Sequence, residues 1–454
     1  MGVIYSFIGF ILAIGILVAV HEFGHFWVAR KLGVKVLTFS IGFGKPIWRK
    51  VAGSDQVEYV IAQIPLGGYV KMLGQGDPDT PVKPEEAHRA FDNQPVWKRA
   101  LIVAAGPAIN FLLAIILFMA LGMQSVTVPK ATFDDVPIGS MISQAGVTAG
   151  DTLLKVDGMD VDHLFQHDLY VFNQVLKRED VKIKVRSDGR EFEAILATST
   201  LPIYRISPQG LMRNLGFAGI GRKVTTEVAS VSQGSAAANA GLQAGDVFIS
   251  IADMPINKWQ DLTSSIRPNA GKELDVVVLR NGQLIHQTIT PTSKTEAGQT
   301  FGLLGVSPRV LPLAVEKTVT IDRSPLQAFS YGVEQTWLMS SLSLRMLGKM
   351  ITLQVSHENV NGPLMIASVA GDAIQISFSY YLYFLALISI SLGVMNLLPV
   401  PMLDGGHLAT YLIEIVAGKP FSERVFLAVQ PLGLIMLASL MCLAFYNDIL
   451  KIMN

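Results

Sequence analysis

Four long apolar stretches stand out from the pattern of hydrophobic and polar positions along the chain. They cover about residues 3–29, 100–123, 376–402 and 425–446, and each reaches the roughly 20 residues that a helix needs to cross a bilayer. The first stretch lacks the basic start and small-residue cleavage site of a signal peptide, so we interpret it as a retained helix. The pattern predicts a multi-pass α-helical membrane protein with four transmembrane helices.

Between the second and third stretches, the chain contains an internal repeat. The sequence AGVTAGDTLLKVDGM at 145–159 aligns with AGLQAGDVFISIADM at 240–254. Each copy is followed by two segments of β-type alternation joined at a turn signal, Asp188-Gly189 in the first copy and Asn281-Gly282 in the second. We expect two tandem β-rich domains of one type.

The AGLxxGD pattern in these copies resembles that of PDZ domains in bacterial proteases. The resemblance implies binding of a peptide as an extra strand at a sheet edge, with capture of a C-terminal carboxylate on backbone amides. A generic small β-rich domain is the alternative. The glycine-rich apolar stretch that closes each copy would supply the peptide-binding loop, namely Leu215, Gly216 and Phe217 in the first copy and Gly302 and Leu303 in the second.

A further amphipathic segment follows the second repeat. Its apolar side chains fall on one side of a helical wheel and its polar ones on the other, which predicts a helix on a membrane surface or packed against protein. The apolar side consists of Leu326, Phe329, Val333, Trp337, Leu344, Leu347 and Ile351.

The segment 57–74 between the first two spans alternates as a β-strand and is broken by Pro-Leu-Gly-Gly at 65–68. It predicts a membrane-associated β-hairpin. An apolar hairpin can pair with an unwound substrate at its edge, and a structural plug is the alternative. The residues predicted to contact substrate are Gly67, Gly68, Tyr69 and Val70.

Composition supports a membrane protein and excludes other classes. Half of the residues are hydrophobic and 16% are charged, against about 25% charged in soluble domains. The net charge is zero, so no concentrated basic face is expected and a nucleic-acid partner is excluded. Cys442 is the only cysteine, and an intrachain disulfide is therefore impossible.

The basic residues predict the orientation in the membrane. They cluster after the first span and directly before the second, which places the connecting loop in the cytoplasm. The N-terminus and the region 124–375 then lie on the outer side. The residues concerned are Arg30, Lys31, Lys35, Lys45, Arg49, Lys50, Lys98 and Arg99.

The first span ends in the sequence HEFGH at 21–25, the metal-binding pattern of a hydrolase that uses water. His21 and His25 are four residues apart and so share one face of a helix. Glu22 lies close enough to hold a metal-bound water without having to ligate the metal. A hydrolytic zinc needs three protein ligands and an open position, so a third ligand has to come from elsewhere.

The best candidate for the third ligand is Asp404, in NLLPVPMLDGGH at 396–407. An acidic residue beside a transmembrane segment is costly and usually functional. Pro399 and Pro401 break the helix, which allows the aspartate to turn toward a neighbour. His407 competes as a ligand, but it can be solvated near the cytoplasmic interface.

HEFGH in the first span and NLLPVPMLDGG in the third resemble the HExxH and NxxPxPxLDG motifs of the site-2 protease family of intramembrane zinc metalloproteases. SIGFG at 40–44, the GGYVKMLG segment and NGPLMIA at 361–367 extend the resemblance over nearly the whole chain. It implies one Zn²⁺ per chain, held by three ligands, with a glutamate as general base and an asparagine on substrate. By position, the ligands are His21, His25 and Asp404, the base is Glu22 and the asparagine is Asn396.

The resemblance also implies a biological setting. The enzyme would reside in the bacterial inner membrane, with its active site toward the cytoplasm and the PDZ-like domains in the periplasm. Its substrates would be single-span proteins, typically an anti-sigma factor already cut on its outer side and possible signal-peptide remnants, in envelope-stress signalling. The tandem domains would act as a size filter or as a peptide sensor.

Two other classes of protein remain open. A metal transporter would use intramembrane His and Asp residues as a transit site, but it would be expected to show repeated halves and ligands on several spans. A catalytically silent peptide-binding scaffold would not need Glu22.

The predicted domain order runs from one end of the chain to the other as follows: transmembrane helix 1 with HExxH at 1–31, cytoplasmic loop with the hairpin at 32–97, transmembrane helix 2 at 98–123, PDZ-like domains at 127–221 and 222–309, linker with the amphipathic helix at 310–375, transmembrane helix 3 at 376–403, cytoplasmic-side loop at 404–424 and transmembrane helix 4 at 425–447.

Overall fold

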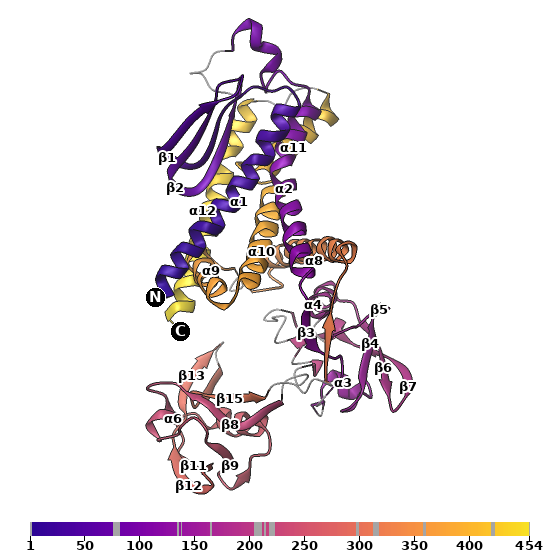
Figure 1. Cartoon of the computed structure of the whole chain (residues 1–454), viewed down its shortest axis with the longest axis vertical. Coiled ribbons are helices and arrows are strands. Elements are labelled where there is room, and N and C mark those ends of the chain that lie inside the picture. Colours follow the sequence, from indigo (N-terminus) through magenta and orange to yellow (C-terminus); the bar gives the residue numbers. More distant parts are fainter. Residues whose placement is uncertain are drawn as a thin grey trace. The chain divides into compact units, whose positions relative to one another are not determined.

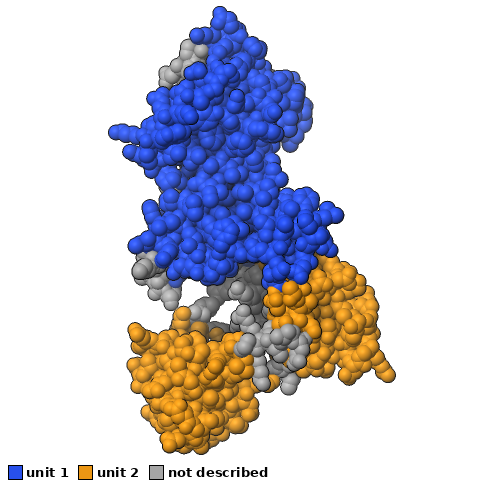
Figure 2. Space-filling model, viewed as in Figure 1, with its two compact units in different colours: residues 1–126, 202–206, 321–454 blue, residues 127–201, 207–320 orange. Residues whose placement is uncertain are grey.

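In the computed structural model (Figure 1) the chain forms two compact units, which Figure 2 shows in different colours and which we describe separately. Unit 1 comprises residues 1–126, 202–206 and 321–454, and unit 2 comprises residues 127–201 and 207–320. The residues described are 2–453 apart from 76–81, 134–135, 138, 164–165, 204–210, 213–214, 218–222, 297–298, 312–316, 357–359 and 419–422. The final residues of the LGFAGIG stretch therefore lie outside the described residues.

Unit 1 is built on helices that are long and apolar enough to cross a membrane. Four such helices occur among the described residues, in agreement with the four apolar stretches in the sequence. They are α1 (Gly2–Lys31), α2 (Val96–Gly122), α10 (Phe378–Leu397) and α12 (Glu423–Met453).

The prediction of a loop over 404–424, between α10 and α12, is wrong. This segment begins with helix α11 (Asp404–Ala417), which ends at Gly418 in a left-handed conformation. Tyr411 of this segment is buried in a core with α1 and α2 residues such as Phe26 and Ile102. Packing of this kind contributes most of the stability of a helix in a protein. Asp404 is thereby the first residue of a helix and not part of an irregular loop.

Two further helices precede α10. The predicted amphipathic segment forms α8 (Pro325–Ile351), which begins with a capping box between Ser324 and Gln327. It packs against α2 through its small residues Ala328 and Gly332, while Trp337 is 75% exposed. A second helix, α9 (Pro363–Ile376), was not predicted.

Helix α9 is held at its N-terminus by a side chain from α12. The Asp448 carboxylate accepts hydrogen bonds from the backbone N–H groups of Gly362, Leu364 and Met365, at 2.7, 2.9 and 3.1 Å. A carboxylate is stabilising at this end of a helix, where unpaired N–H groups and the positive end of the helix dipole meet. This contact explains why a charged residue is tolerated, fully buried, in α12.

The segment between α1 and α2 forms a sheet from two long antiparallel strands, β1 (Val36–Ala52) and β2 (Val57–Met72). The hairpin predicted within 57–74 has its turn in the wrong place. Residues 65–68 lie inside β2, and β1 and β2 are joined at 53–56. Both strands bend, so that Ser40 is paired with Val60 on one side and with Tyr69 on the other. The first half of β1 is therefore central, and the last residues of β2 form one edge.

Unit 2 contains two β-rich parts with the same order of elements. The first has β4 (Thr152–Val156), β5 (Met159–Asp160), α4 (Asp168–Lys177), β6 (Val181–Ser187) and β7 (Arg190–Leu196), in the sheet order β5-β4-β6-β7. The second has β9 (Val247–Ile251), β10 (Met254–Pro255), α7 (Trp259–Ile266), β11 (Leu274–Arg280) and β12 (Gln283–Ile289). The turn signals at 188–189 and 281–282 join β6 to β7 and β11 to β12 with positive φ angles, as predicted.

The second part has additional strands. β8 (Lys223–Val231) and β15 (Val306–Leu311) extend its sheet to the order β12-β11-β9-β8-β15, and β13 (Thr292–Glu296) pairs with β14 (Gln299–Leu303). A separate pair is formed by β3 (Val126–Pro129) and β16 (Thr318–Ile321), at the two ends of the region between α2 and α8.

The aspartate of each AGxxxGD motif has a structural role. Asp151 accepts a hydrogen bond from the Thr148 N–H, and Asp246 accepts one from the Gln243 N–H, both at 2.8 Å. Asp246 also forms a bidentate pair with Arg280. Burial on its own would raise the pKa of Asp246, but the hydrogen bonds from Arg280 and Gln243 hold that pKa below its ordinary value.

Candidate metal centre

Helix α1 places the two histidines and the glutamate of HEFGH in the interior of unit 1. His21, Glu22 and His25 are each only 9% exposed. The helical spacing brings both imidazoles to the same side, with the Nε2 atoms 3.3 Å apart. The apolar sequence before them explains why this pair lies within a helix long enough to cross a membrane.

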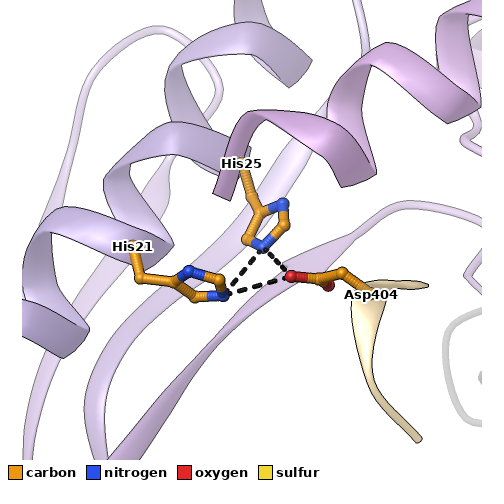
Figure 3. Close-up of side chains that lie close together, drawn as sticks. All are labelled: His21, His25 and Asp404. Atoms are coloured by element: carbon orange, nitrogen blue, oxygen red, sulfur yellow. Dashed lines mark hydrogen bonds and ion pairs between the residues drawn. The ribbon is translucent and has the colours of Figure 1, made fainter. Parts of the chain in front are cut away.

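Asp404 approaches the histidines from the junction between helices α10 and α11. Helix α10 ends at Leu397, the chain passes through Pro399 and Pro401 without helical structure, and α11 then starts at Asp404. Proline lacks the N–H that would continue the helix, so the backbone changes direction here. Figure 3 shows the resulting convergence of the Asp404 carboxylate on His21 and His25.

The three donor atoms fit a metal ion. Asp404 Oδ2 lies 3.3 Å from His21 Nε2 and 3.5 Å from His25 Nε2. Ligands bound tetrahedrally at about 2.0 to 2.1 Å are separated from one another by about 3.3 to 3.4 Å. Asp404 Oδ2 is buried without a hydrogen-bond donor among the described residues, which suits an oxygen whose partner is a cation. His407 lies one turn further along α11, in the wall of the same cavity.

Helix α2 supports the imidazoles from behind. His25 Nδ1 is 2.9 Å from the Ile102 carbonyl oxygen, and His21 Nδ1 is 3.1 Å from the Asn110 side-chain amide. Between these two contacts lies Gly106, where a Cβ atom would be 2.2 Å from His25 Nε2. Gly106 and Asn110 are not among the residues predicted from the sequence. The available signal was a glycine and an asparagine one helical turn apart in an apolar span.

We expect Gly106→Ala to abolish metal binding. Alanine normally stabilises a helix interior by about 1 kcal/mol over glycine, yet here its methyl group would displace the imidazoles. The measurement is the metal content of purified protein. Gly15→Ala in α1 is the matched control, because nothing lies within 4 Å of a Cβ atom at that position. Normal metal content in the Gly106 variant would contradict the predicted packing.

The cluster opens into a cavity of about 740 Å³. One wall is the edge of β2, where Gly68, Tyr69 and Val70 line the cavity next to Glu22. Asn396 is a second wall residue, with its Nδ2 atom 3.4 Å from His21 Nε2. Gly67 precedes this edge in β2 and is not a lining residue.

Part of the cavity lining is polar. Arg99 pairs with Glu414 at 2.7 Å, and its guanidinium lies 5.0 Å from the centre of the Tyr411 ring. Gln75 and Asp92 also line the cavity. Polar lining of this kind can hold the water that a hydrolytic reaction consumes.

The five residues predicted for peptide-binding loops lie in two kinds of environment, a buried core and a groove. Leu215 is 0% and Phe217 3% exposed, and Phe217 packs against Phe133, so these two side chains belong to a core. Gly302 and Leu303 instead line a groove of about 330 Å³ against α7. Gly216, between the two buried residues, is itself buried.

A unit of long apolar helices that places two histidines, a glutamate and an aspartate around one cavity has the residue set of a metal-dependent hydrolase in a membrane protein. The family model of peptidase family M50 matches residues 9–440, and the chain belongs to this family, the site-2 proteases. The protein is therefore a metalloprotease.

The chain is similar over its full length to curated relatives. It is 38% identical to the "Regulator of sigma E protease" of Salmonella typhi, over 99% of both chains. It is also 38% identical to the "Regulator of sigma-E protease RseP" of Escherichia coli K12, over 98% of both chains, and to the "Protease RseP" of Yersinia pestis, over 99% of both.

Proposed function

We propose that this metalloprotease uses one zinc ion to hydrolyse peptide bonds within the membrane spans of single-span proteins. The observation that carries the proposal is the position of the ligand cluster, because two of its three residues, His21 and His25, belong to a helix long and apolar enough to cross a membrane. The test is cleavage of a labelled membrane-span substrate by purified protein in liposomes, with the cut located by mass spectrometry. A cut only outside the span would contradict the proposal.

His21, His25 and Asp404 would hold the zinc, since two imidazoles and a carboxylate with an open fourth position suit this ion. When bound, zinc polarises the scissile carbonyl and makes water more acidic. Glu22 takes the proton of the attacking water and delivers it to the leaving nitrogen. Asn396, beside His21, contacts the substrate carbonyl or its developing negative charge.

The edge of β2 would hold the substrate in an extended form. A substrate helix must unwind, because its peptide bonds are enclosed in its own hydrogen bonds. Residues Gly68 to Val70 form the edge of the sheet beside Glu22, and Gly68 is close enough that a Cβ atom would lie 2.8 Å from the Glu22 side chain. An added strand would therefore pass the base directly.

A proline scan of this edge tests strand addition. Successive N–H groups of an edge strand point alternately into the sheet and away from it. One of the two variants Tyr69→Pro and Val70→Pro therefore removes an N–H that points away from the sheet, toward an added strand. That variant should cleave about tenfold more slowly or worse, as expected for about 1.5 kcal/mol of lost hydrogen bonding. Lys50→Pro on the opposite edge is the control. Wild-type cleavage rates in both edge variants, with zinc bound, would rule out strand addition.

The biological role we propose is sigma-E regulation in the bacterial inner membrane, by cleavage of an anti-sigma factor already trimmed on its outer side. The full-length similarity to regulators of sigma-E protease supports it. The loop 32–97 would face the cytoplasm and unit 2 the periplasm, because the flanking Lys and Arg residues follow the positive-inside pattern. Protease accessibility of unit 2 in intact spheroplasts tests this orientation: protection from added protease would reverse it.

The two β-rich parts of unit 2 would act as PDZ-like domains that filter substrates by size or sense a new C-terminus. Their shared element order and the groove beside Gly302 and Leu303 support this role. Deletion of 127–309 should permit cleavage of substrates with bulky outer domains, or remove dependence on the C-terminal residue of the trimmed substrate. A variant that keeps both selectivities would contradict the role.

A further inference from the structure

Both imidazoles of the cluster are held at Nδ1 by α2, which leaves each Nε2 directed at Asp404. For His25 the partner is a backbone carbonyl, Ile102 O at 2.9 Å, which can only accept a hydrogen bond. For His21 the partner is a side chain, the amide nitrogen Nδ2 of Asn110, which lies 3.1 Å from His21 Nδ1. The orientation of His21 thus depends on residue type at position 110, whereas that of His25 does not.

Asn110 is in an unusual environment for an amide. It is 0% exposed, and its Oδ1 atom has no hydrogen-bond partner among the described residues. A buried acceptor left unsatisfied costs roughly 1 to 3 kcal/mol. Its backbone carbonyl is separately paired, accepting from the Ser389 hydroxyl at 2.8 Å. A buried amide in an apolar helix, with an unsatisfied oxygen that destabilises the fold, indicates that the side chain has a role.

The chemistry of His21 supplies that role. When Nε2 of a neutral imidazole is used as a ligand, Nδ1 carries the proton and needs an acceptor. A half-turn of the Asn110 amide exchanges its nitrogen for its oxygen in front of Nδ1. The amide can therefore donate to Nδ1 in one tautomer and accept from it in the other.

We propose that Asn110 is a positioning residue for the metal centre, which fixes the ring orientation and the proton position of His21. The proposal rests on the proposed role of His21 as a zinc ligand. The affinity of the site for zinc then depends on Asn110, a residue that does not touch the ion. Gly106, one turn earlier in α2, provides the space in which both imidazole rings reach this helix.

The experiment is a competition titration of zinc against a chelator, on the full chain in detergent. Asn110→Leu keeps the side-chain size without hydrogen bonding, and we expect it to weaken zinc affinity by about 10- to 100-fold, as for other supporting residues of metal ligands. Asn110→Asp retains an acceptor, and its affinity should stay close to that of the wild type. Ser389→Ala removes a neighbouring buried hydrogen bond without touching His21, and should leave affinity unchanged.

The outcomes separate this proposal from the one it rests on. Unchanged affinity in Asn110→Leu would overturn it, and so would equal losses in the Leu and Asp variants, because packing alone would then explain both. His21→Ala in the same titration tests the ligand itself. If that variant binds zinc as tightly as the wild type, the proposed ligand set fails, whatever the Asn110 variants show. Thermal unfolding of the metal-free variants confirms that each is folded.

Discussion

Glu22→Gln should reduce cleavage of a membrane-span substrate by about 10³-fold while the protein still binds one zinc ion. Glutamine keeps the size and hydrogen-bonding reach of the side chain but cannot take the proton of the attacking water, and general-base catalysis contributes typically 10²- to 10⁴-fold. Glu22 is buried, follows His21 directly in α1 and lies beside Gly68 of the β2 edge, so it is well placed to act as this base. The measurement is the initial rate of cleavage in liposomes, together with metal content.

The control for this prediction is Glu414→Gln, which changes another carboxylate that lines the same cavity. Glu414 pairs with Arg99 and is not part of the group of possible metal ligands, so its loss should affect the rate far less. Equal cleavage by the wild type and by Glu22→Gln would show that the assigned mechanism is wrong.

Asp404→Asn should lower zinc affinity by more than about 100-fold, and activity with it. Loss of a residue that merely supports a ligand already costs 10- to 100-fold in affinity, and here a charged ligand would be replaced by a neutral amide. Asp404 Oδ2 is the oxygen within 3.5 Å of both Nε2 atoms. Chelator competition on the purified variant measures the effect.

His407→Gln is the companion variant, because His407 is the competing third ligand suggested by the sequence. It lies in the cavity wall, outside the cluster of donor atoms formed by His21, His25 and Asp404, and its replacement should leave zinc bound. Retention of zinc in Asp404→Asn, combined with its loss in His407→Gln, would reverse the assignment.

Local sequence patterns were sufficient for the four long apolar helices. The apolar stretches that predict transmembrane spans correspond to α1, α2, α10 and α12, because long runs of apolar residues are stable only where they are buried in lipid or protein. The turns at Asp188-Gly189 and Asn281-Gly282 were equally local, since they require positive φ angles that these residue pairs adopt readily.

Predictions from the sequence were wrong at two segments whose structure depends on packing with residues far away in the chain. Residues 65–68 carry a strong break signal, yet they lie within β2, because pairing of both strand halves with β1 outweighs the local preference. The segment 404–417 was expected to be a loop, and it is a helix whose Tyr411 packs in the core with α1 and α2 residues such as Phe26 and Ile102.

The sequence by itself determined which side chains are available: HEFGH and LDG contribute two imidazoles and two carboxylates, and the apolar stretches around them predict helices long enough to cross a membrane. Only the tertiary structure decided that Asp404 meets His21 and His25, that the β2 edge lies beside Glu22, and that Gly106 and Asn110 of α2 shape the site. The reason is physical. Spacing along one helix fixes which side chains share a face, but distances between helices depend on the packing of residues far apart in the chain.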